Sequence, residues 1–177
     1  MGLRRLGAVM AAGLALAVCG GGDEPAGPLR AADDRLADDP RDPAALAAVV
    51  RAAHAEAQQH VDPDTGEYTA GARPALDRAA AVWPRYVRAT RGRVDGGVAS
   101  VMSALYADGL KRPRDAADAQ RLGTEARPSA AGYVRLIYLY ERAGDRRQAL
   151  RAGRKAIALA KPAERDGIRH ILEELDH

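Results

Sequence analysis

The sequence has 177 residues, which is room for one domain of ordinary size, and 29% of them are charged. The formal net charge of +3 falls to +1 when residues 1–18 are left out, because this segment carries two arginines and no acidic residue. Such a balance excludes the strongly cationic surface of a nucleic-acid-binding protein. Alanine dominates the hydrophobic class, phenylalanine is absent, and long alternating β-branched runs are missing. We therefore expect an all-α protein, since alanine is the strongest helix former.

The first 18 residues are typical of an export signal. Arg4 and Arg5 precede an uncharged run over residues 6–18, which is shorter than the roughly 20 residues that a membrane-spanning helix needs. A polar, glycine-rich stretch over residues 20–25 follows. This order predicts a signal peptide over residues 1–18.

Cys19 is the single cysteine, so no disulfide can form within the chain. The segment Leu16-Ala17-Val18-Cys19 resembles the lipobox of bacterial lipoproteins, although Val18 stands where that family has Gly, Ala or Ser. The resemblance implies a lipidated Cys19 and a location on the outer face of the bacterial cytoplasmic membrane. Residues 15–17 also form an A-x-A site, and cleavage there would release a secreted chain that begins at Val18.

Residues 19–39 are interpreted as the lipidated cysteine and a tether with one short helix over 29–37. The helical-repeat domain is expected to span residues 40–177, and its clearest unit covers residues 129–162. The first helix of this unit carries apolar residues at i, i+3, i+4 and i+7, a break follows at 144–145, and Pro162 ends the second helix. The apolar face consists of Tyr133, Leu136, Ile137 and Tyr140.

A second unit over residues 97–128 shares the same period. Tyr106 and Tyr140 are 34 residues apart, and so are Pro128 and Pro162. The turn over residues 108–115 carries about one extra residue. A third, distorted unit combines residues 38–60 with residues 69–90, and its segment 61–69 is an insertion.

These units resemble the tetratricopeptide repeat (TPR), a 34-residue helix–turn–helix unit. Ala149 and Ala156 match its small positions, whereas Gly153 stands where an aromatic residue is usual. Pro84 is expected to kink the helix that contains it. The final segment carries apolar residues at i, i+3, i+4 and i+7 and is expected to cap the array: Ile168, Ile171, Leu172 and Leu175.

The TPR resemblance also implies a concave groove, lined by the first helix of each unit, that binds a peptide or protein. Tyr138 is the main candidate anchor, because it lies off the apolar face of its helix; packing against a neighbouring repeat is the alternative. The groove positions carried over from the family are Ala47, Arg51, His54, Ser100, Ala104, Val134, Tyr138 and Glu141.

The sequence indicates no catalytic, metal or cofactor site. His54 and His60 are six residues apart and do not share a helix face, and Asp62 and Asp64 belong to a predicted solvated turn. The basic runs at 111–115 and 146–155 are interpreted as solvated faces, with an anionic lipid surface as the alternative.

Taken together, the sequence predicts an all-α, TPR-like solenoid of about three degenerate repeats with a C-terminal capping helix. The expected function is a non-catalytic, exported and lipid-anchored protein–protein interaction module. Two alternatives remain: a secreted, unanchored structural protein, and a small enzyme with a site scattered over the solenoid.

Overall fold

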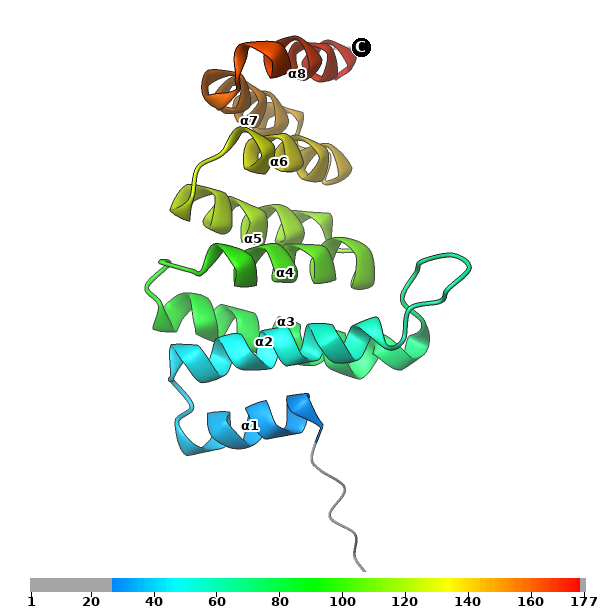
Figure 1. Ribbon diagram of the computed structural model, residues 1–177, viewed down its shortest axis with the longest axis vertical. Helices are drawn as coiled ribbons and strands as arrows, with labels where there is room; N and C mark the ends of the chain where they lie inside the picture. The colour runs from blue at the N-terminus through cyan, green and yellow to red at the C-terminus, as the bar shows by residue number, and fades with distance from the viewer. Residues whose placement is uncertain (1–26, 176–177) are drawn as a thin grey trace, which may run out of the picture.

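The computed structural model describes residues 27–175, which form a stack of helices from α1 at one end to α8 at the other (Figure 1). The signal peptide and Cys19 lie outside the described residues. A single-turn 3₁₀-helix, Ala70–Ala72, precedes α3. The α-helices are α1 Pro28–Asp38, α2 Pro43–Gln58, α3 Arg73–Ala89, α4 Gly96–Ala104, α5 Pro113–Ala126, α6 Ala130–Arg142, α7 Arg146–Leu159 and α8 Pro162–Glu174.

The helices pair as three antiparallel hairpins. Helices α2 and α3, α4 and α5, and α6 and α7 form the closest contacts, and α5 packs against α6 to join the second and third hairpins. Helix α8 packs against α7 at the C-terminal end. The expected all-α solenoid of three helical hairpins with a closing helix is therefore confirmed.

Local sequence signals start these helices. Proline occupies the first turn of α1, α2, α3, α5 and α8, where its missing N–H costs nothing. Side-chain oxygens accept hydrogen bonds from the first-turn N–H groups of α2, α4, α6 and α7. These capping residues are Asp42, Asp95, Ser129 and Asp145. The break expected at 144–145 is this last cap together with Gly144, whose φ of 72° suits glycine.

The extra residue in the second unit is absorbed by a π-helical turn over Leu105–Gly109, which directly continues α4. The N–H of Leu110 donates to the carbonyl of Leu105 at 2.9 Å, an i to i+5 bond. Gly109 lies against α3, because a Cβ added there would come within 2.6 Å of Leu76 Cδ2. The wider turn thus keeps the second hairpin in contact with the first.

Helix α1 belongs to the packed array, whereas the sequence pattern assigns it to the tether. Ala32 and Leu36 are buried in the main core, and Arg78 of α3 donates to Asp33 at 2.8 Å through Nε. Helix α1 covers α2 in this way and ends the stack opposite α8 (Figure 1). Aspartates at positions 33, 34, 38 and 39 dominate this segment, so the sequence pattern does not reveal the buried face that Ala32 and Leu36 form.

The core forms two clusters. The larger cluster spans α1 to α5 and also includes Leu139 of α6. The smaller one lies between α6, α7 and α8 and is built around Ile137, Ala149 and Ile168. Helix α3 continues through Pro84, which lies on its exposed side. None of the described helices is long and apolar enough to cross a membrane.

Candidate interaction surfaces

The predicted groove residues lie on α2, α4 and α6, the first helix of each hairpin. Within each helix their spacing of three or four residues places them on one side, which we call the first-helix face. Seven of the eight predicted positions are exposed or half-exposed. Ala47 is the exception, since it is only 6% exposed and belongs to the main core. Its side chain is therefore not available to a partner.

On the α2 part of this face, two polar side chains are already engaged. Arg51 forms an ion pair with Asp95 at 3.3 Å, which connects α2 to the cap of α4. Nε2 of His54 lies 3.2 Å from Nε2 of Gln58, whose amide donates to the Tyr68 hydroxyl at 2.7 Å. The Gln58–Tyr68 hydrogen bond joins the insertion 61–69 to α2, and the insertion projects from the side of the stack (Figure 1).

Between α4 and α6 the first-helix face is hollowed. Ser100 of α4 lines a shallow depression of about 430 Å³ together with Arg135 of α6 and Arg127 of the α5–α6 loop. Gly97 and Gly132 lie at the starts of α4 and α6 and leave the backbone accessible there. The sequence pattern does not identify the two arginines, because neither stands at a groove position carried over from the family.

Tyr138 lies on α6 with 47% of its surface exposed. Among the described residues, only Leu159 of α7 is another large apolar side chain exposed to this degree, at 49%. Tyr138 is therefore not buried by a neighbouring repeat, which was the alternative raised by the sequence. Its neighbours one turn away on the same face are Val134, which is half-buried, and Glu141, which is exposed.

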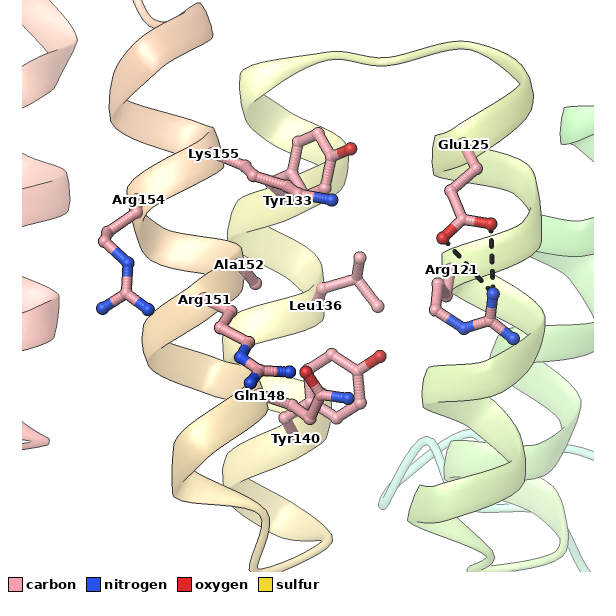
Figure 2. A pocket seen from close by; sticks show the side chains of 10 residues that line it. All are labelled: Arg121, Glu125, Tyr133, Leu136, Tyr140, Gln148, Arg151, Ala152, Arg154 and Lys155. Atoms are coloured by element: carbon pink, nitrogen blue, oxygen red, sulfur yellow. Dashed lines mark hydrogen bonds and ion pairs between the residues drawn. The ribbon is translucent and has the colours of Figure 1, made fainter.

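A second concave surface lies on the other side of α6. Figure 2 shows a cleft between α5 and α7, with α6 at its back. Its volume is about 410 Å³. Tyr133, Leu136 and Tyr140 of α6 form its floor with Ala152 of α7. We call it the α5–α7 cleft. The apolar spacing in the sequence predicts only a core role for these α6 side chains.

Charged side chains surround this floor. Arg121 of α5 donates to both carboxylate oxygens of Glu125, at 3.3 and 3.0 Å. On α7, Arg151 points toward Tyr140, and Nζ of Lys155 lies 5.3 Å from the centre of the Tyr133 ring. Arg154 points away from the floor (Figure 2).

The Tyr140 phenol is a weaker acid than an ordinary tyrosine, because burial is the main cause that raises its pKa above the ordinary value. The nearby Arg121 guanidinium acts in the opposite direction but does not outweigh burial. The Tyr140 hydroxyl therefore stays protonated at neutral pH and is able to donate a hydrogen bond.

Asp62 in the insertion has a structural role. The Asp62 carboxylate accepts hydrogen bonds from the N–H groups of Thr65 and Asp64, at 3.0 and 2.9 Å, and these bonds lower its pKa. Gly66 completes the turn with a φ of 71°. Over residues 27–175, no group of three His, Cys, Asp or Glu side chains is placed to hold a metal ion.

The fold and these surfaces define an all-α array of helical hairpins with two concave faces. Among solved structures, a thermophilic TPR protein of Thermus thermophilus aligns with 83% of this chain and 70% of its own, at 19% identity and a TM-score of 0.49. No protein-family model and no curated protein matches the chain. The helices and their packing therefore define the fold.

Proposed function

We propose that this protein is a non-catalytic interaction module that binds a peptide or protein on its first-helix face. The observation that supports the proposal is the exposure of Tyr138. An aromatic side chain buries a large area when a partner covers it, and aromatic residues are common anchors of protein interfaces. Small or short side chains at Ser100 and Ala104 of α4 leave room beside the helix for an extended segment.

The module is proposed to act at the outer face of the bacterial cytoplasmic membrane, anchored by a diacylglyceryl group on Cys19. The export-signal pattern over residues 1–18 and the lipobox-like segment before Cys19 support this location. Anchoring would raise the local concentration of the array for a membrane-associated partner. A partner-binding array also accounts for the lack of any catalytic residue indicated by the sequence.

Affinity capture from the envelope fraction of the source bacterium tests the binding face. We expect Tyr138→Ala to lose a partner that the unaltered protein retains. Leu159→Ala is the matched control, because it removes a side chain of similar exposure from α7. Equal partner sets for both variants would remove Tyr138 from the interface.

The anchor is tested by intact-mass analysis of the protein from the membrane fraction. A chain that begins at Cys19 and carries the added mass of a diacylglyceryl group is expected. A soluble chain that begins at Val18 would contradict the anchor but would leave the proposed binding face untouched.

A further inference from the structure

The α5–α7 cleft combines an apolar floor with cations that lack acidic partners. Arg151 and Lys155 form no ion pair within the described part of the chain, whereas Arg121 is held by Glu125 and lies 3.8 Å from Asp118. Helix α7 supplies five basic residues and no acidic one. Arg151 and Lys155 therefore present positive charge to the cleft that no ion pair neutralises among the described residues.

The geometry of the floor favours a bound partner that places an apolar side chain between the charged side chains of the cleft. Leu136 lies between Tyr133 and Tyr140 on α6 (Figure 2), but it is only 2% exposed, so the half-buried Tyr140 ring offers most of the accessible apolar surface of the floor. A volume of about 410 Å³ accommodates a few side chains of an extended peptide. A membrane surface is flat and would reach the rim cations without filling the floor.

We propose that the α5–α7 cleft binds an acidic linear segment of a partner protein, with one apolar side chain against the Tyr140 ring. Carboxylates on either side of that side chain pair with Arg151 and Lys155, and the Tyr140 hydroxyl donates to one of them. Charge complementarity between the partner's carboxylates and the cations of the cleft supports this assignment.

The cleft and Tyr138 lie on opposite sides of α6, because Leu136 and Tyr138 are two residues and about 200° apart around the helix. The proposal therefore does not depend on the first-helix face.

A peptide titration followed by NMR of the tyrosine rings tests the proposal. The probe is the blocked peptide acetyl-Glu-Glu-Leu-Glu-Glu-amide, and its neutral control replaces each Glu with Gln. We expect the acidic peptide to shift the ring signals of Tyr133 and Tyr140 and to leave Tyr138 unchanged. Shifts centred on Tyr138, equal shifts with the neutral peptide, or no shifts with either would overturn the proposal.

Charge reversals within one helix separate the cleft from general attraction to α7. Arg151→Glu and Lys155→Glu are each expected to weaken binding by at least about tenfold. Arg147→Glu is the matched control, because Arg147 is exposed on the same helix but does not line the cleft. Equal losses in all three variants would contradict a defined site. Arg151→Gln, which removes the charge without reversing it, is expected to show a smaller loss and guards against a folding defect.

Vesicles distinguish a peptide site from a lipid-binding face. We expect the unaltered protein, tested without its lipid anchor, to sediment equally poorly with phosphatidylglycerol and with phosphatidylcholine vesicles. Sedimentation that requires phosphatidylglycerol and is lost in Arg151→Glu would assign the cations to a membrane and overturn the peptide proposal.

Discussion

At the scale of single residues, glycine sets how closely the helices approach. Gly123 of α5 faces α4, and a Cβ added there would lie 2.8 Å from the Ala99 Cβ and 3.4 Å from the Gly96 carbonyl oxygen. Neither atom belongs to the far end of a flexible side chain, so relief requires a shift of the backbone. Gly153 differs, since a Cβ there would overlap the Leu172 side chain of α8, whose Cδ atoms are the mobile end of a flexible side chain. The two glycines therefore bring α5 and α7 close to their neighbours with different tolerance for a larger residue.

We predict that Gly123→Ala lowers the free energy of unfolding by about 1–3 kcal/mol, because the added methyl group separates α4 from α5. Urea denaturation followed by circular dichroism measures the change. Gly167→Ala is the matched control, since a Cβ at Gly167 in α8 meets nothing within 4 Å. There the better helix propensity of alanine is expected to stabilise the protein by up to about 1 kcal/mol. An unchanged free energy of unfolding in Gly123→Ala would show that the α4–α5 contact adjusts to the added methyl group without cost.

At the scale of elements, the sequence predicts most of the helices because their signals are local. Apolar spacing, prolines in the first turn and the Asp or Ser caps are all readable without tertiary information. The 34-residue interval between Tyr106 and Tyr140 then orders these helices into hairpins. The extra residue near 108–115 is also visible in the sequence, although the pattern does not reveal that a π-helical turn absorbs it.

Features that depend on packing between distant helices are not predictable in this way. The repeat pattern assigns Ala47 to the groove, but it is buried in the main core, to which α1 contributes Ala32 and Leu36. The α5–α7 cleft likewise requires side chains from three helices. The core role that the sequence predicts for Leu136 is confirmed, since it is 2% exposed, whereas Tyr140 on the same apolar face is only half-buried. Periodicity identifies an apolar face, but it does not say whether a neighbouring helix covers all of it.

At the scale of the whole molecule, the array has a seam between α5 and α6. The two core clusters meet there, and both concave surfaces on α6 border it. Leu139 of α6 is packed in the larger cluster, and Tyr140 contacts both clusters. In a stack where each hairpin contacts mainly its neighbours, stability is roughly a sum of local terms.

We therefore predict that α6–α8 open at a lower free energy than α2–α5, because the C-terminal cluster buries fewer apolar side chains. Native-state hydrogen exchange as a function of denaturant measures the two values. Leu139→Ala removes the principal side chain that joins α6 to the larger cluster. We expect Leu139→Ala to lower the free energy of opening of α6–α8 by about 2–5 kcal/mol and to affect that of α2–α5 less. A single common free energy for all helices, in both proteins, would show that the array unfolds as one unit.

Site-specific photo-crosslinking in living cells shows whether the first-helix face of this array holds a partner. The photoreactive amino acid p-benzoylphenylalanine replaces Tyr138 in one variant and Leu159 in another. We expect one discrete crosslinked protein from position 138 and none from position 159. The same crosslinks from both positions, or none from position 138, would contradict it.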